Sequence, residues 1–157
     1  MTRPTRPSLR LAPGVVDHIP DLALRLRPID IIECTAMGRS AQQALQHGLA
    51  ASAQTWTALI DGEPHAMFGI VVGSAVSGDA IPWFLGSAQV ARHARALIAQ
   101  GPELLRTMHR HGRVLSNFVS CDNHQAIRLL EHWGFTMEQE HIVMRSVPFR
   151  RFVRESV

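Results

Sequence analysis

The stretch that decides the fold is SNFVSCDNHQAIRLLEHWGF, residues 116–135. It begins within an apolar, β-branched run over residues 114–121, which predicts a strand. Asp122 or Asn123 can then accept hydrogen bonds from the free amides of a first helical turn, which predicts a helix as far as Trp133. Gly134 can adopt the left-handed conformation that ends a helix. The stretch therefore predicts a strand, a capped helix and the start of a second strand.

The rest of the chain predicts further strands and helices. The alternating apolar and basic residues of Leu22–Arg27 indicate a strand with one buried face, and Asp61-Gly62 is typical of a hairpin turn. Gly101-Pro102-Glu103 interrupts a helical stripe, so we expect two consecutive helices or one sharp kink there. The other expected strands are residues 55–60, 65–72, 80–85, 135–143 and 144–153, and the other expected helices are residues 30–38, 41–53 (capped by Ser40) and 89–108.

The composition is that of one globular domain. The chain has 157 residues, of which 46% are hydrophobic and 18% charged, so it has enough apolar material for a core. Residues 1–14 hold three Arg and three Pro, which predicts an extended basic arm with Leu9 and Leu11 as anchors, followed by a folded domain over residues 15–157. Two cysteines without C-x-x-C spacing favour a reducing compartment, and no apolar stretch has the length of a signal-peptide core or a membrane span.

The order N-x-x-A-x-x-L-x-E-x-x-G-F, from Asn123 to Phe135, resembles the last conserved segment of the GCN5-related N-acetyltransferases (GNATs). This resemblance implies an α/β (α+β) fold, with one GNAT-like domain whose central mixed, mostly antiparallel sheet of six to seven strands is flanked by about four helices. In that family the helix carries an aromatic hydroxyl that protonates the departing thiolate of coenzyme A. Here that position is Leu130, and the chain contains no tyrosine.

A second segment is similar to the family's cofactor loop, [QR]-x-x-G-x-[GA], whose backbone amides bind the pyrophosphate of coenzyme A. Gln89 and Ala94 match this pattern, whereas Arg92 stands at the first glycine. An ordinary amphipathic helix capped by Ser87 is the simpler interpretation of the same residues. If acetyl-CoA binds, the resemblance implies as cofactor-binding residues Phe84, Leu85, Ser87, Gln89, Val90, Arg92, Ala94, Asn123, Ala126 and Leu130.

Candidates for proton transfer are few. Without tyrosine, a proton donor would have to be Cys121, a histidine or water. Glu33 and His65 are candidate bases, and Asn117 could orient a substrate, although each of these residues also fits an ordinary surface or capping role. The densest histidine pair, in His109-Arg110-His111, is spaced so that its members point to different sides of a helix, and no metal site is predicted.

Arginines gather at both ends of the chain. Arg3, Arg6 and Arg10 lie in the N-terminal arm, and four more, Arg145, Arg150, Arg151 and Arg154, lie around Phe149 and Phe152. Interleaved Arg and Phe can contact nucleic acid or an acidic protein surface. A solvated strand with inward-facing Phe has the same pattern.

Short blocks within residues 22–145 resemble a bacteriophage family that has the GNAT fold and is similar to the small internal virion, or core, protein of short-tailed coliphages. These blocks are residues 26–30, 52–58, 61–69, 81–86, 115–119 and 133–135. The resemblance implies a phage protein of the virion or its assembly with little or no catalysis. Its termini would contact other virion or assembly proteins, and it would lie in the host cytoplasm or the virion.

Two other functions are consistent with the sequence. The main alternative is an active N-acyltransferase that uses acetyl-CoA through a divergent cofactor loop. The third hypothesis is a nucleic-acid-binding module that uses the Arg-rich ends, for which the affinity would fall with rising salt concentration.

Overall fold

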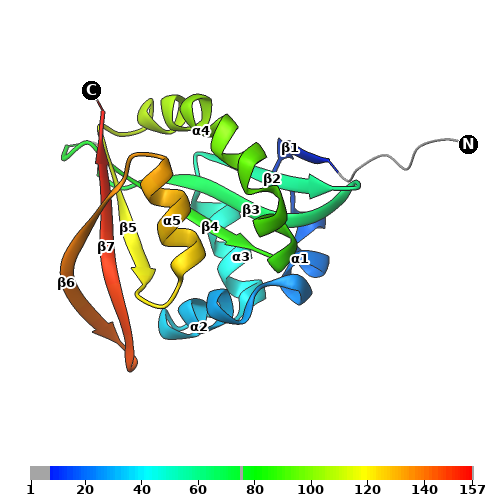
Figure 1. The fold of residues 1–157 in the computed structure, drawn as a ribbon, viewed down its shortest axis with the longest axis horizontal. Coiled ribbons are helices and arrows are strands. Elements are labelled where there is room, and N and C mark those ends of the chain that lie inside the picture. Colours follow the sequence, from blue (N-terminus) through cyan, green and yellow to red (C-terminus); the bar gives the residue numbers. More distant parts are fainter. Residues whose placement is uncertain (1–7, 75, 157) are drawn as a thin grey trace, which may run out of the picture.

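The computed structural model describes residues 8–74 and 76–156, which contain a seven-stranded sheet in the order β1-β2-β3-β4-β5-β7-β6 (Figure 1). Neighbouring strands are antiparallel except β4 and β5, which are parallel. The expected fold class is confirmed as a single α/β domain with a mixed, mostly antiparallel sheet. The strands are β1 (Leu9–Pro13), β2 (Gln54–Ile60), β3 (Glu63–Val72), β4 (Asp79–Gly86), β5 (Val114–Ser120), β6 (Thr136–Met144) and β7 (Val147–Glu155).

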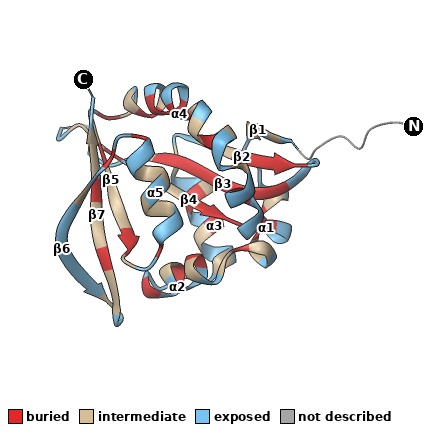
Figure 2. Ribbon diagram, in the orientation of Figure 1, coloured by how far each residue is buried: buried red, intermediate tan, exposed pale blue. Residues whose placement is uncertain are grey.

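Helices cover both faces of the sheet. On one face α1 (Ile19–Arg25), α2 (Pro28–Ala36) and α3 (Ala41–Ala51) enclose a core that includes Met67 and Leu85. On the other face α4 (Ala94–His109) and α5 (His124–His132) pack on a larger core that includes Phe68. Two 3-10 helices, η1 (Val16–His18) and η2 (Ala88–His93), precede α1 and α4. Figure 2 shows the contrast between the buried central strands and the exposed edge strand β6.

Several local signals act as the sequence predicts. Ser40 begins α3 with a capping box in which its hydroxyl accepts from the Gln43 amide at 3.1 Å. Asn123 caps α5 by accepting from the Ala126 amide at 3.3 Å. Gly134, with φ of 85°, ends α5 in the left-handed conformation that favours glycine.

The strand predicted over Leu22–Arg27 is wrong, because most of this segment is helix α1. Ile19, Leu22 and Leu26 are buried at helical spacing, while Leu24 is 89% exposed. Pro20 also starts the helix, since proline fits the first helical turn. The apolar and basic alternation is thus produced by a helix whose exposed side also carries a leucine.

Of the two alternatives predicted at Gly101-Pro102-Glu103, two separate helices are not found, because α4 continues through Pro102. Figure 1 shows the ribbon of α4 changing direction along its length, as a proline inside a helix requires. The helix also begins later than predicted, at Ala94, because residues 88–93 form η2.

The N-terminal segment that was expected to be an arm contributes a strand to the sheet. Leu9–Pro13 forms β1, which pairs with β2 at the edge. Leu9 and Leu11 pack against the larger core. Residues 1–7, with Arg3 and Arg6, lie outside the described residues. None of the described helices is long and apolar enough to cross a membrane.

Candidate functional site

The parallel strands β4 and β5 diverge, and the site is built on the gap between them. They pair only at Asp79–Val114 and Ala80–Leu115. Farther along, the side-chain amide of Asn117 donates to the Pro82 carbonyl at 2.9 Å and bridges the widening gap. A cavity of about 660 Å³ opens here, lined from both faces of the sheet.

The peptide group of Phe84 faces this gap. In an antiparallel ladder, alternate residues of a strand direct both N–H and C=O to the same side. On β4, the Pro82 carbonyl accepts from Asn117, and Gly86 uses its N–H and C=O to bind Asp30 and the Arg27 amide, all away from β3. Phe84 lies between these two residues, so its N–H points the same way. No described residue accepts a hydrogen bond from it.

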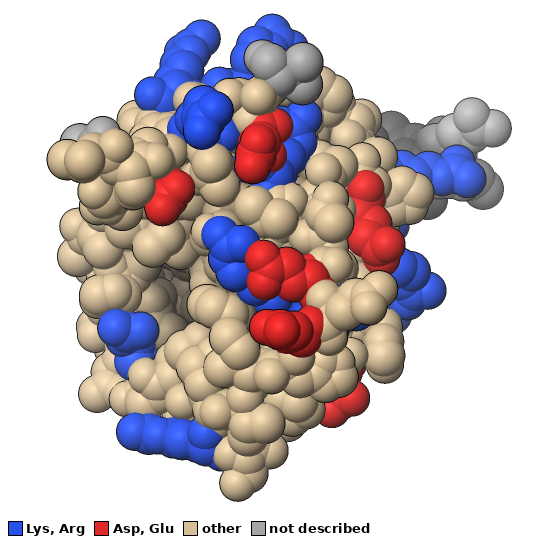
Figure 3. All heavy atoms as spheres, turned by 90° about the vertical axis from the view of Figure 1, so that its left-hand side faces the viewer, with Lys and Arg blue, Asp and Glu red and all other residues tan. Residues whose placement is uncertain are grey.

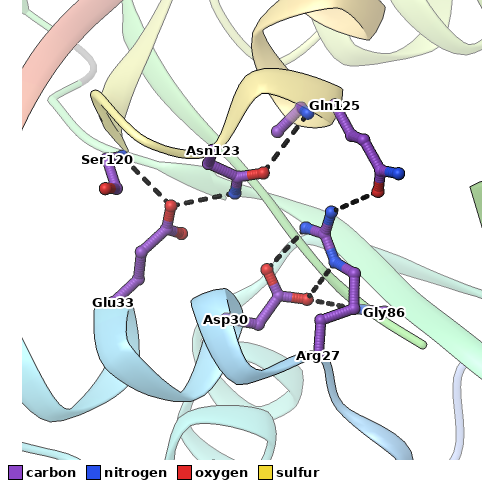
Figure 4. A network of polar contacts seen from close by, with 8 residues as sticks. Arg27, Asp30, Glu33, Gly86, Ser120, Asn123 and Gln125 are labelled. Carbon is purple, nitrogen blue, oxygen red and sulfur yellow. Dashed lines mark hydrogen bonds and ion pairs between the residues drawn. The ribbon is translucent and has the colours of Figure 1, made fainter. Parts of the chain in front are cut away.

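A buried ion pair fixes the end of β4 (Figure 4). Asp30, which is 0% exposed, accepts from the Arg27 guanidinium at 2.7 Å and from the Gly86 amide at 3.0 Å. Arg27 also donates to the Gln125 side chain at the start of α5, at 3.0 Å. These bonds connect α2 to β4 and to α5 across the gap. The ion pair between Arg27 and Asp30 was not predicted from the sequence, although oppositely charged residues at i and i+3 at a helix start indicate such a pair.

Glu33 ties α2 to the other side of the gap. Its Oε1 accepts from the Ser120 amide at 3.0 Å and from the Asn123 side-chain amide at 2.9 Å. Burial raises the pKa of Glu33, and the two hydrogen bonds lower it by less. Its second oxygen, Oε2, makes no hydrogen bond to a described residue. A carboxylate with a raised pKa that lines the cavity can act as a proton acceptor.

The start of η2 is already hydrogen-bonded within the chain. Ser87 accepts the Gln89 amide on its hydroxyl, at 3.2 Å, and the Val90 amide on its carbonyl, also at 3.2 Å. The Ser87 hydroxyl also lies 2.8 Å from His65 Nδ1, and burial lowers the pKa of His65. The segment that resembles the GNAT cofactor loop is therefore a capped 3-10 helix.

The structure brings most of the proposed site residues together. Eight of the ten cofactor candidates line the cavity, and they are Phe84, Leu85, Ser87, Val90, Ala94, Asn123, Ala126 and Leu130. Gln89 and Arg92 are exposed and do not line it. Of the catalytic candidates, Glu33 and Asn117 line the cavity, whereas Cys121 and His65 do not. The roles of these residues remain predictions.

Cavity residues that sequence reasoning missed lie on the face covered by α1–α3. Cys34, Arg39, Trp83 and Phe118 all line the cavity there. Burial raises the pKa of the Cys34 thiol to about 11, so this thiol is neutral near neutral pH. Only the topology shows that these residues meet, because they come from separate segments of the chain.

The arginines of β7 are engaged within the domain. Arg151 pairs with Glu138 at 2.6 Å, Arg150 donates to the Glu138 carbonyl at 2.7 Å, and Arg154 donates to the Trp133 carbonyl at 3.0 Å. Phe149 and Phe152 are buried. Figure 3 shows that basic and acidic side chains are interspersed over much of this face. Among the described residues, no three His, Cys, Asp or Glu side chains are placed to hold a metal ion.

Comparison with solved structures identifies the fold. The aminoglycoside acetyltransferase AAC(6')-Ib, in complex with paromomycin and acetyl-CoA, is 21% identical over 94% of this chain and 93% of its own, with a TM-score of 0.61. A presumptive acetyltransferase of Acinetobacter baylyi ADP1 is 13% identical over 97% and 95%, with a TM-score of 0.70. A GNAT-family acetyltransferase from Bacillus anthracis is 7% identical over 94% of each chain, with a TM-score of 0.62.

The chain has the GNAT fold. The likeness to these proteins extends over nearly the whole domain, and the diverging β4 and β5 lie within the shared part. No family model and no curated protein matches the sequence. The finer resemblance to a phage virion protein finds no support in these matches.

Proposed function

We propose that this GNAT-fold chain is an acetyl-CoA-dependent N-acyltransferase, with the cofactor in the gap between β4 and β5. The observation that carries the proposal is the Phe84 N–H, which faces the gap without a partner among the described residues. A fixed backbone donor of this kind can stabilise an oxygen that becomes negatively charged in acyl transfer.

The cavity lining also supports this proposal. Between α4 and α5 its wall is apolar, formed by residues such as Val90, Ala94 and Leu130, and suits an extended pantetheine chain. The pyrophosphate would lie near the start of η2 and α4. Because Ser87 already uses the amides of Gln89 and Val90, we expect side-chain cations such as Arg92 and Arg95 to assist there.

Acetyl-CoA supplies an acetyl thioester, in which the acyl carbon bonds to the amine nitrogen as its bond to sulfur breaks and the sulfur keeps the electron pair. Phe84 donates its N–H to the acyl oxygen. Glu33, whose Oε2 has no hydrogen-bond partner among the described residues, would take the proton that the amine nitrogen loses. Leu130 has no proton to give, so water would have to protonate the departing sulfur.

The other function that the sequence suggested is a phage protein of the virion or its assembly with little or no catalysis. Two features bear on its lack of catalysis. Leu130 stands at the position of the hydroxyl-bearing residue, and η2 replaces the glycine cradle. Both changes are expected of a GNAT-fold protein that binds partners through its surface and does not catalyse acyl transfer. Cofactor binding separates the two proposals.

The test is a calorimetric titration of the full chain with acetyl-CoA. We expect saturable binding that is weakened at least about tenfold by Ala94→Trp, because an indole would fill the apolar wall of the cavity. The matched control is Ala99→Trp, an exposed position of α4 outside the cavity lining, which should leave the affinity unchanged. No binding at millimolar acetyl-CoA would refute the acyltransferase and favour the assembly protein.

A further inference from the structure

Positive charge exceeds negative charge in the cavity. Its lining includes Arg27, Arg39 and Arg128 but only one carboxylate, Glu33. Asp30 neutralises Arg27 at 2.7 Å. Within residues 8–74 and 76–156, no ion pair or hydrogen bond engages the guanidinium of Arg39 or that of Arg128. Arg128 belongs to α5, whereas Arg39 lies beside α2 and α3, so Arg39 is the guanidinium that can bind an anionic group of the acceptor.

Arg39 lies on the α1–α3 side of the cavity, in a rigid connection between two helices. Its amide donates to the Cys34 carbonyl at 3.0 Å, and Ser40, the next residue, caps α3. The side chain is half-buried. A planar guanidinium held in this way can bind a carboxylate through two parallel hydrogen bonds.

Glu33 and Arg39 are both tied to the C-terminal half of α2. Glu33 is adjacent to Cys34 in α2, and Arg39 bonds to the Cys34 backbone. Both side chains also line the cavity. A ligand that touches both residues needs an amine for Glu33 and an anionic group for Arg39.

Two aromatic residues provide an apolar wall on this side. Trp83 of β4 is fixed by an N–H bond to the Ser52 hydroxyl at 2.7 Å and by packing on Gly48 of α3. Phe118 of β5 lies across the gap from it, and both line the cavity. Such surfaces suit an apolar side chain of moderate size.

We propose that the acceptor is an apolar α-amino acid. Its carboxylate pairs with Arg39, its amine lies at Glu33 and its side chain packs against Trp83 and Phe118. This inference rests on the acyltransferase activity proposed above. The products are the N-acetyl amino acid and coenzyme A, and the amine proton passes to Glu33.

The test compares amino acids with the same molecules lacking the carboxylate. The four pairs are L-alanine with ethylamine, L-leucine with isoamylamine, L-methionine with 3-methylthiopropylamine, and L-phenylalanine with 2-phenylethylamine. Binding is measured by calorimetry on the cofactor-free chain, and acetyl transfer is measured by thiol release from acetyl-CoA. We expect at least one amino acid to exceed its amine about tenfold or more in affinity and in kcat/KM, as a charge-assisted bidentate contact implies.

Arg39→Gln should reduce that preference to about twofold or less, and Arg39→Lys should retain part of it. Arg106→Gln, at an exposed position of α4 outside the cavity, is the control and should leave the preference intact. If every amino acid and its amine had the same affinity and the same kcat/KM, the inference would be overturned, but the proposed transferase activity would not. An unchanged preference in Arg39→Gln would have the same consequence. If acetyl-CoA did not bind, the transferase activity would be refuted. The affinity of the cofactor-free chain for amino acids would still test whether the cavity binds an amino acid.

Discussion

The two sides of the cavity are built from different residues. The side between α4 and α5 is mostly apolar, with Arg128 as its charged residue, whereas the side beneath α2 and α3 holds Glu33, Arg39 and a neutral thiol, Cys34. Each side nevertheless rests on a tryptophan packed against a helix glycine, Trp83 on Gly48 and Trp133 on Gly101. The gap itself comes from the divergence of β4 and β5. A chain with this fold can therefore have the cleft without the glycine-rich cofactor motif, because the divergence of the backbone strands opens the cleft.

Removing the buried carboxylate that supports the polar side should have the largest effect. Asp30→Ala leaves the Arg27 guanidinium and the Gly86 amide without their partner. We expect the free energy of unfolding to fall by about 3 kcal/mol, as for other broken buried pairs. Urea denaturation followed by circular dichroism measures the loss. Asp17→Ala, at an exposed position, should change stability by less than about 0.5 kcal/mol, and a similarly small loss in Asp30→Ala would show that the ion pair does not hold the gap.

The paired glycines allow each side to be disturbed separately. A Cβ on Gly48 would lie 2.5 Å from Trp83 Cζ2, and one on Gly101 would lie 2.4 Å from Trp133 Nε1. We expect each alanine variant to lose about 1–2 kcal/mol of stability, since overpacking outweighs the gain in helix propensity.

The functional effects of the two variants should differ. Gly48→Ala should raise the KM of the amine acceptor and leave the affinity for acetyl-CoA within about twofold, whereas Gly101→Ala should weaken acetyl-CoA binding and leave the acceptor KM nearly unchanged. Calorimetry and steady-state kinetics on the same samples measure both. If either variant changed both parameters equally, the two sides would act as one site.

Local signals in the sequence predicted much of the fold. The caps Ser40 and Asn123 and the left-handed Gly134 fix helix ends by bonds to near neighbours, so a short window of sequence contains them. The strand prediction for Leu22–Arg27 was wrong because it counted Leu24 as buried, whereas this side chain is exposed. Without Leu24, the remaining apolar residues fit a helix.

The site was predictable on one side only. The apolar side follows the order of a known family's segments, so Ala94, Ala126 and Leu130 were placed by resemblance. The polar side has no such template. Arg39 and Trp83 belong to no recognisable motif in their own segments of the sequence. They line the same cavity only because the fold brings these segments together, and no local sequence pattern predicts that.

Restoring a hydroxyl on the apolar side should have a moderate effect. Leu130→Tyr places a proton donor at the position where the resembling acetyltransferases carry one. We expect kcat to rise about tenfold, or about 1.4 kcal/mol, because protonation of the leaving thiolate becomes internal. Leu130→Phe is the control for size and should give no increase. An equal response of both variants would mean that the hydroxyl supplies no proton and that packing alone changed the rate.

The smallest effect concerns the charge on the polar side. Burial raises the pKa of Glu33 above its ordinary value of 4.5, so the group stabilises the fold below that pH, and this contribution is lost as the pH rises through the folded pKa. Glu33→Gln keeps an oxygen that can accept from Ser120 and Asn123 but cannot ionise. Relative to this variant, the natural chain should therefore lose stability as the pH increases from about 4 to about 7.

Urea denaturation across that pH range measures this difference, and Glu140→Gln, an exposed carboxyl on β6, should show none. A natural chain that gained stability over Glu33→Gln with rising pH would have its carboxylate favoured by the Ser120 and Asn123 hydrogen bonds more than burial disfavours it. The pKa of Glu33 would then be lowered. The residue would be a structural anchor instead of a base, and the polar side of the cavity would lose its proton acceptor.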